Sequence, residues 1–197
     1  MCNKLEICDR TVVDWTNFCR ELLFDWLMNE QQQLGGPGII VEVDEVKIGK
    51  RKFYKGRLVK GQWIFGGIER VTRKVFIVPV ENRRSETLLT LITKYIAPRS
   101  IIYSDCWRGY TALENDNNYV HKTVNHSENF VDPNTNVHTQ NIERLWRELR
   151  SNIPRFGTRE YHYNHYIAEF LFKRVYAFDK LIDAFFEIMS KLYPINN

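Results

Sequence analysis

The spacing of apolar residues divides the chain into a helical N-terminal part and a strand-rich part. Over residues 11–29 the apolar side chains recur at steps of three and four, which predicts a helix with one buried face. A glutamine run and a glycine-rich turn within residues 31–38 then mark a boundary. Residues 39–44, 62–68 and 74–80 are rich in β-branched and aromatic side chains. We expect three strands there, the last two forming an antiparallel pair.

Helical and strand patterns alternate in the second half of the chain. Ser85 stands where the N-cap of a helix belongs, and residues 100–103 and 119–124 predict two further strands. A helical stripe begins near Thr139, and residues 161–193 form an aromatic-rich helical tail. Three strands, a helix, two strands and then helices predict a mixed α/β fold, an α+β mixed sheet of the ribonuclease-H-like type, with helical extensions at both termini.

The composition is that of a globular protein, with 44% hydrophobic and 26% charged residues. No run of 18 apolar residues occurs, so we expect no membrane-spanning segment. The first residues are partly acidic and lack an apolar signal core, which argues against secretion. The four cysteines have neither zinc-site nor disulfide spacing and indicate reduced thiols. We therefore expect an intracellular protein, nuclear if its host is eukaryotic and otherwise cytoplasmic.

Positive charge is concentrated in one segment of the chain. The formal net charge is only +4, yet residues 46–60 hold seven Lys or Arg side chains and no acid. Such a run suits a polyanion, because each cation placed on a phosphate releases a condensed counterion. A solvated hairpin is the alternative explanation. The candidate DNA-binding residues of this segment are Lys50, Arg51, Lys52 and Lys55.

Three acids stand where they could form a catalytic site: Asp44 and Asp105 at the ends of predicted strands, and Glu143 in a predicted helix. Two-metal phosphoryl transfer needs carboxylates from separate elements that converge on a pair of divalent ions. Taken singly, the two aspartates could cap turns and Glu143 could be a surface acid. Taken together they predict a site, because an acid after a central strand is costly unless it is paired or metal-bound.

Side chains near these acids are candidates for contacts with DNA. Arg147 and Arg150 follow Glu143 by four and seven residues, so the three share one helical face. A guanidinium on that face is placed to hold a phosphate that runs past the ions. Trp107 follows Asp105 closely, and we expect it to pack beneath the site instead of stacking on a base.

Long motifs in a fixed order extend over most of the chain. On these motifs the sequence resembles the DDE transposases of the Merlin superfamily and their bacterial insertion-sequence relatives with an ISXO-type transposase domain. The resemblance runs from about residue 10 to about residue 175. It is carried by residues 35–45, 49–56, 61–69, 104–110, 124–133 and 138–146.

The resemblance implies a ribonuclease-H-like transposase with Asp44, Asp105 and Glu143 as its catalytic, metal-binding triad. It implies two Mg²⁺ or Mn²⁺ ions, cutting of transposon ends by water, and joining of the freed 3′-hydroxyl to target DNA. Some bacterial relatives have Asn as the third member, which makes Asn141 the alternative to Glu143. A carboxylate binds Mg²⁺ better than an amide does, and this favours Glu143. The alternative function is that of a non-catalytic, transposon-derived DNA-binding protein.

The resemblance also implies a domain organisation. Members of the family usually carry a helix-turn-helix region before the catalytic domain, but only ten residues precede Thr11 here. We expect residues 1–34 to be the helical remnant of that region in a truncated enzyme. Residues 35–197 are then expected to be the catalytic domain with its C-terminal helices. The apolar tail is expected to close the core, and a homodimer contact is the alternative.

Overall fold

The computed structural model describes residues 7–30, 32–49, 61–126, 128, 131–133, 135–154 and 158–194. The chain divides into two compact units. The larger is Gln32–Glu160, and the smaller combines Met1–Gln31 with Tyr161–Asn197.

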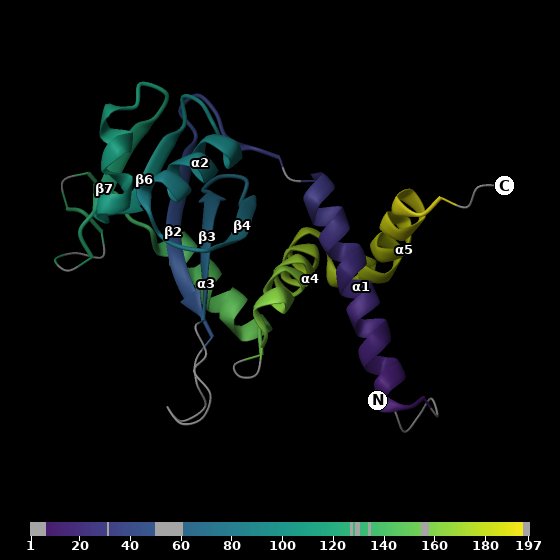
Figure 1. The fold of residues 1–197 in the computed structure, drawn as a ribbon. Helices are drawn as coiled ribbons and strands as arrows, with labels where there is room; N and C mark the ends of the chain where they lie inside the picture. Colours follow the sequence, from purple (N-terminus) through teal and green to yellow (C-terminus); the bar gives the residue numbers. More distant parts are fainter. Residues whose placement is uncertain are drawn as a thin grey trace, which may run out of the picture. The chain divides into compact units, whose positions relative to one another are not determined.

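The larger unit is built on a five-stranded mixed sheet (Figure 1). In spatial order its strands are β4 (Val75–Val80), β3 (Gln62–Glu69), β2 (Ile40–Ile48), β6 (Ile101–Asp105) and β7 (Val120–Val124). The first three pair antiparallel, and β6 and β7 continue the sheet from β2 in parallel. Three antiparallel strands followed by two parallel ones are the arrangement of a ribonuclease-H-like fold. The predicted mixed α/β class and the antiparallel pairing are confirmed.

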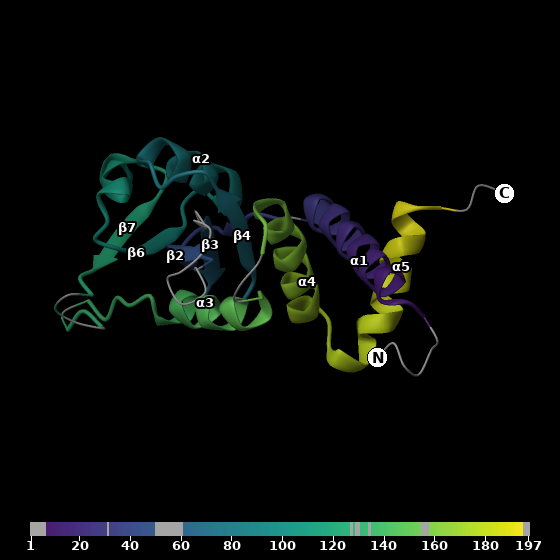
Figure 2. The same cartoon turned by 60° about the horizontal axis from the view of Figure 1, so that its bottom comes forward.

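Two helices cover opposite faces of this sheet (Figure 2). They are α2 (Ser85–Tyr95), which buries Leu88, Ile92 and Tyr95, and α3 (Gln140–Asn152), which buries Ile142, Leu145, Trp146 and Leu149. A 3₁₀ segment, η3 (Arg108–Asn115), connects β6 to β7. A second, two-stranded parallel sheet pairs β1 (Leu34–Gly35) with β5 (Ile96–Ala97).

The expected N-cap of α2 differs from the observed one. Ser85 is the first residue of the helix, and Arg84 occupies the N-cap position with extended backbone angles. The Ser85 hydroxyl donates to the carbonyl oxygen of Gly109 at 2.8 Å. The serine therefore ties α2 to η3, a partner that local spacing could not reveal.

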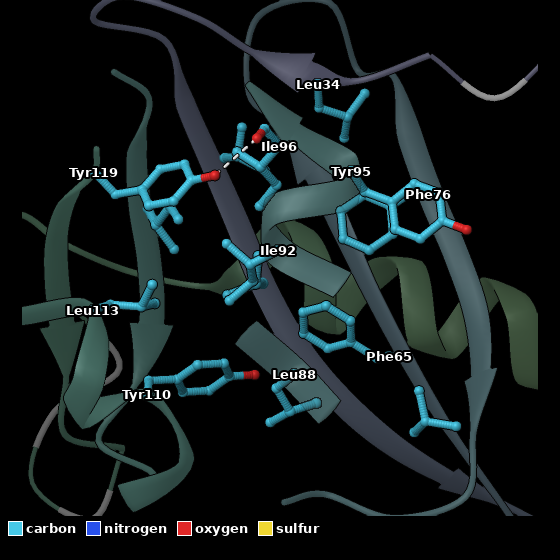
Figure 3. Packing of buried hydrophobic residues seen from close by; sticks show 14 residues of the cluster. Leu34, Phe65, Phe76, Leu88, Ile92, Tyr95, Ile96, Tyr110, Leu113 and Tyr119 are labelled. Atoms are coloured by element: carbon cyan, nitrogen blue, oxygen red, sulfur yellow. Dashed lines mark hydrogen bonds between the residues drawn. The ribbon is translucent and has the colours of Figure 1, made fainter. Parts of the chain in front are cut away.

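The core between the sheet and α2 is aromatic (Figure 3). The rings of Phe76 and Tyr95 stack with centroids 4.9 Å apart, and Phe65 packs against Phe76. The buried Tyr119 hydroxyl donates to the carbonyl oxygen of Ile96 at 3.0 Å (Figure 3). Val41 and Val43 of β2 point into this core. Because strand side chains alternate, the residues between and beyond them face α3 instead.

Two glycines in β3 leave room for large aromatic rings, one on each face of the sheet. A Cβ on Gly66 would lie 2.6 Å from Cη2 of Trp146, and a Cβ on Gly67 would collide with the ring of Phe76. Gly66 therefore faces α3 and Gly67 faces α2, as strand alternation requires. The absence of a side chain at Gly66 lets the Trp146 ring lie directly over the strand.

The smaller unit consists of α1 (Asp9–Glu30), α4 (Tyr163–Val175) and α5 (Leu181–Leu192), with short 3₁₀ turns η4 (Glu160–His162) and η5 (Phe178–Lys180) at its connections. The Trp26 ring packs edge-on against Phe172, with centroids 5.8 Å apart. Arg20 pairs with Glu169 at 2.7 Å.

The C-terminal helices thus group with α1, because the apolar face of α4 is covered by side chains from the other end of the chain. Such a contact leaves no trace in local periodicity. That residues 35–197 form the catalytic domain stays a prediction. That α1 is a helix-turn-helix remnant stays a prediction. Within the described ranges, no helix combines the length and the apolar character that crossing a bilayer requires.

Candidate active site

Asp44 and Asp105 lie level with each other on neighbouring parallel strands. In the β2–β6 pairing, Ile40 lies opposite Ile101 and Glu42 opposite Tyr103. The same offset separates Asp44 from Asp105, so this register, continued by two residues, places them opposite each other. Side chains two apart on a strand share a face, so both carboxylates lie on the α3 face of the sheet. β2 continues past Asp44 to Ile48, and Asp105 is the last residue of β6.

Asp44 accepts two hydrogen bonds and lies near two other carboxylates, those of Glu45 and Asp105. Oδ2 accepts the indole N–H of Trp146 at 2.9 Å, and Oδ1 accepts the backbone N–H of Glu45 at 2.8 Å. Burial, together with the nearby carboxylates of Glu45 and Asp105, nevertheless raises the pKa of Asp44 to about 7. Burial is the largest cause of this shift, and the carboxylates of Glu45 and Asp105 add to it.

Glu45 belongs to the same carboxylate cluster, although the sequence patterns did not single it out. Burial and the charge of Asp105 raise its pKa to about 7, while Tyr110 and Arg83 act in the opposite direction. Its Oε1 is buried and finds no hydrogen-bond partner among the described residues. The sequence does contain a signal for Glu45: it is the third acid, after Glu42 and Asp44, in residues 39–46, whose other side chains are all apolar.

Asp105 also orders the chain that follows it. Its Oδ1 accepts the backbone N–H of Trp107 at 3.0 Å, which closes a local turn. Asp105 is not the N-cap of η3, because Trp107 occupies that position without a side-chain cap bond. The bond from the Trp107 N–H occupies one carboxylate oxygen. It is compatible with a ligand on the other oxygen, because a carboxylate has about four acceptor sites.

Glu42 anchors the N-terminus of α3 to the central strand. Its side chain is fully buried, and Oε2 accepts the backbone N–H groups of Asn141 and Ile142 at 2.9 and 3.1 Å. Oε1 accepts from Nε of Arg70 at 2.7 Å. An anion at a helix N-terminus satisfies otherwise orphan N–H groups and complements the helix dipole. Glu42, which the sequence patterns also did not single out, therefore fixes α3 relative to Asp44.

Glu143 lies in the first turn of α3, next to His126. Its carboxylate is 37% exposed, with Oε1 3.5 Å from Nε2 of His126. The same histidine nitrogen lies 2.6 Å from the Thr139 hydroxyl. Trp146, which binds Asp44, is one helical turn further along, so Glu143 and Trp146 share one side of the helix.

The amide of Asn141, the alternative third ligand, is engaged elsewhere. Its Nδ2 donates to Glu42 Oε1 at 2.6 Å, and its Oδ1 accepts from Nη1 of Arg73, also at 2.6 Å. The Asn141 side chain therefore helps to attach the N-terminus of α3 to the sheet.

The structure brings Asp44, Glu45 and Asp105 close together, and Glu143 lies on α3, the helix that covers the sheet face of Asp44 and Asp105. In the part of the chain that the structure describes, no group of three His, Cys, Asp or Glu side chains already has the spacing of a metal centre. The residues nevertheless fit a divalent cation. Repelling carboxylates and an unpartnered buried oxygen, that of Glu45, are what such an ion neutralises.

Residues 33–174 match the protein family described as the ISXO2-like transposase domain. The chain belongs to this family. It is also 31% identical over 97 residues to an uncharacterized transposase-like protein of Haemophilus influenzae (strain ATCC 51907 / DSM 11121 / KW20 / Rd). That alignment covers 49% of this chain and 76% of the relative. A transposase-type role follows for the chain.

Solved structures similar to this ISXO2-like transposase include two integrase core domains. One is the catalytic core domain of BIV integrase, with 14% identity and a TM-score of 0.46, covering 78% of this chain and 97% of that one. The other is the HTLV-2 integrase catalytic core domain in complex with magnesium. It has 11% identity and a TM-score of 0.40, and covers 84% of this chain and 90% of that one.

The predicted DNA-binding residues of the ISXO2-like transposase fall into two groups. Arg147 and Arg150 are exposed on α3, at helical spacing from Glu143. Lys50, Arg51, Lys52 and Lys55 lie outside the described residues.

Proposed function

We propose that this ISXO2-like transposase cleaves DNA at transposon ends by water and joins the freed 3′-hydroxyl to target DNA. Asp44, Asp105 and Glu143 are the proposed catalytic and metal-binding residues. The observation that carries the proposal is that Asp44 and Asp105 stand on neighbouring parallel strands, where burial and the carboxylates of Glu45 and Asp105 raise the pKa of Asp44. Carboxylates held this close suit divalent cations, and Mg²⁺ or Mn²⁺ are the proposed ones.

Two bound ions would activate the attacking oxygen and stabilise the leaving oxygen of an in-line displacement. The protein's own contribution is to hold the ligands. The Trp146 indole N–H orients Asp44, the Trp107 backbone N–H orients Asp105, and Glu42 fixes the first turn of α3. Glu143 is the proposed third ligand because it lies in that turn and its carboxylate is free of the bonds that engage Asn141.

Cations around this site are the proposed contacts of DNA. Arg147 and Arg150 share the helical face of Glu143, so they can pair with phosphates on either side of the cleaved bond. Lys50, Arg51, Lys52 and Lys55 are proposed to hold DNA non-specifically through its backbone. Acting on genomic DNA would place the protein inside the cell.

Nicking of a supercoiled plasmid at low salt tests the cleavage step. Wild-type protein should nick DNA with Mg²⁺ or Mn²⁺ and not with EDTA. Asp105→Asn, Asp44→Asn and Glu143→Gln should each lower the rate at least 100-fold while DNA affinity stays within a few-fold. Joining is tested by incubating a duplex with a free 3′-hydroxyl end with plasmid and measuring covalent attachment.

Asn141→Ala is the matched control for the third ligand, since it changes the neighbouring side chain of the same helical turn. It should keep metal-dependent nicking if the variant remains folded. Cation binding by wild-type protein without any nicking would favour the non-catalytic DNA-binding alternative. Equal nicking by Glu143→Gln and wild type would remove Glu143 from the site.

A further inference from the structure

Two tryptophans and an arginine form a cluster beside the carboxylates, here named the Trp63–Arg83–Trp107 cluster. Cζ of Arg83 lies 4.2 Å from the ring centroid of Trp63 and 4.4 Å from that of Trp107. Nζ of Lys47 lies 5.4 Å from the centroid of the same Trp63 ring. One guanidinium therefore bridges two indole rings, and a second cation stands alongside.

The cluster is attached to the proposed active site at two points. The backbone N–H of Trp107 donates to Asp105, and two residues of chain span at most about 7 Å. Arg83 is near enough to Glu45 to favour the ionised form of that acid. The Trp107 indole is therefore attached close to Asp105, within reach of a strand bound at that carboxylate.

Trp107 is both held in place and open to solvent. Its side chain is 39% exposed, although the sequence predicted that it packs beneath the site. A Cβ on Gly109 would lie 2.7 Å from Trp107 Nε1, so the ring rests on backbone that only glycine leaves uncovered. An exposed ring that is already held loses little conformational entropy when a ligand stacks on it.

We infer that the Trp63–Arg83–Trp107 cluster binds an unpaired nucleobase of the DNA strand next to the cleaved phosphate. The inference rests on the proposed function. Within a duplex both faces of a base are covered by its neighbours, so an indole can stack only on a base at a strand end or one turned out of the helix. Arg83 lies over both indole rings. Once a base displaces it, its guanidinium can pair with a phosphate.

Fluorescence of 2-aminopurine tests this inference with the full-length chain in EDTA, where no cleavage occurs. The probe base is placed in a three-nucleotide single-stranded overhang of a duplex and, separately, inside a blunt duplex. Wild-type protein should quench the overhang probe and bind the overhang duplex more tightly than the blunt one. Trp107→Ala should lose that preference, about 5- to 100-fold in affinity for the overhang duplex, and change blunt-duplex affinity less than twofold. Trp107→Phe should restore part of the quenching.

Controls separate stacking from folding and from catalysis. Trp15→Ala, which removes an exposed tryptophan of the smaller unit, should leave overhang binding unchanged. Asp105→Asn should lose nicking and keep the quenching. Equal quenching by wild type, Trp107→Ala and Trp107→Phe would overturn the inference, even if wild type nicks DNA. Quenching that depends on Trp107 in a protein that never nicks would support the stacking site and count against the proposed catalysis.

Discussion

Asp44 is the proposed metal ligand whose carboxyl group has a raised pKa. It is partly buried and lies near two further carboxylates, so its ionised form is disfavoured in the folded protein. The pKa of about 7 means that the folded, metal-free protein keeps a proton on this group that the unfolded chain releases near pH 4. Stability of the metal-free protein should therefore fall as pH rises from about 4 to about 7, and remain low above that.

The variant Asp44→Asn tests how the charge of Asp44 affects the stability of the fold. In EDTA at pH 8 the variant should unfold about 2–4 °C higher than wild type, because it removes a destabilising charge. At pH 5 the difference should be less than half as large, since wild type is then protonated in the fold and only the unfolded chain has released the proton. Mg²⁺ should raise the unfolding temperature of wild type and do so much less for the variant. Differential scanning calorimetry at the two pH values measures both effects, and an equal gain at pH 5 and pH 8 would contradict this account.

Among the elements, α3 has its N-terminus attached to the sheet through Glu42. The buried Glu42 carboxylate bonds Arg70 and the first N–H groups of the helix, and the backbone oxygen of His138 just before the helix accepts from Arg70 at 2.9 Å. A buried charge with several partners is costly to disturb, because removing one partner leaves the others desolvated and unpaired. The position of Glu143 relative to Asp44 should therefore depend on Glu42.

Glu42→Gln should destabilise the larger unit by about 3–5 kcal/mol and loosen the start of α3. Hydrogen exchange measured by mass spectrometry should show faster exchange in residues 140–146 than in α2. Glu148→Gln is the matched control on the same helix, since its side chain pairs with Arg144 at the surface. It should cost about 0.5 kcal/mol or less. Unchanged exchange at the start of α3 in Glu42→Gln would show that the anchor is dispensable.

At the scale of the whole molecule, DNA binding should depend on salt through the basic segment. Replacing Lys50, Arg51 and Lys52 by Ala should weaken binding to all sequences alike. It should also reduce the slope of log affinity against log salt by about 0.9 for each phosphate that the variant no longer neutralises. Fluorescence anisotropy over a salt series gives the slope. The control replaces three exposed lysines elsewhere, Lys94, Lys180 and Lys191. A slope that is equally reduced in both variants would reflect net charge only.

The smaller unit presents an apolar surface suited to a second copy of the chain. Phe178 is 92% exposed and Ile182 72% exposed, while Ala184 and Ile188 on the other side of α5 are buried. An apolar cavity of about 550 Å³ adjoins this surface and is lined by residues of α1, α4 and α5. Monomers rarely expose contiguous apolar patches larger than a few hundred Å². One face of α5 therefore packs within its unit, and we propose the other as the site of a homodimer contact.

Light scattering after size-exclusion chromatography tests that contact. Wild-type protein at about 50 μM should have the mass of a dimer, and the double variant Ile182→Glu, Phe186→Glu the mass of a monomer. Val71→Glu, at an exposed turn of the larger unit, should remain dimeric. If wild-type protein is monomeric at this concentration, the homodimer contact is wrong and the C-terminal helices serve only to pack within the smaller unit.

Local patterns in the sequence were sufficient for the elements and for part of the site. Alternation and helical spacing place β2, β6 and α3 within a few residues of their observed bounds, because each pattern reflects which side of an element is buried. The same reasoning selected Asp44 and Asp105, since an acid in an apolar strand is conspicuous and the structure brings these two together.

Tertiary structure alone decided which side chains surround those acids. Trp146 donates to Asp44 across 102 residues of sequence, and Glu42 bonds Asn141 across 99. The apolar faces of α4 and α5 likewise found their partner in α1, at the opposite end of the chain. A sequence pattern indicates that one face of an element is buried or that an acid needs partners. It does not say which residues those partners are, because many different residues could fill that role. Which one is chosen depends on how the whole chain packs, because hydrophobic burial is non-directional and selects a partner only through the fit of complete surfaces.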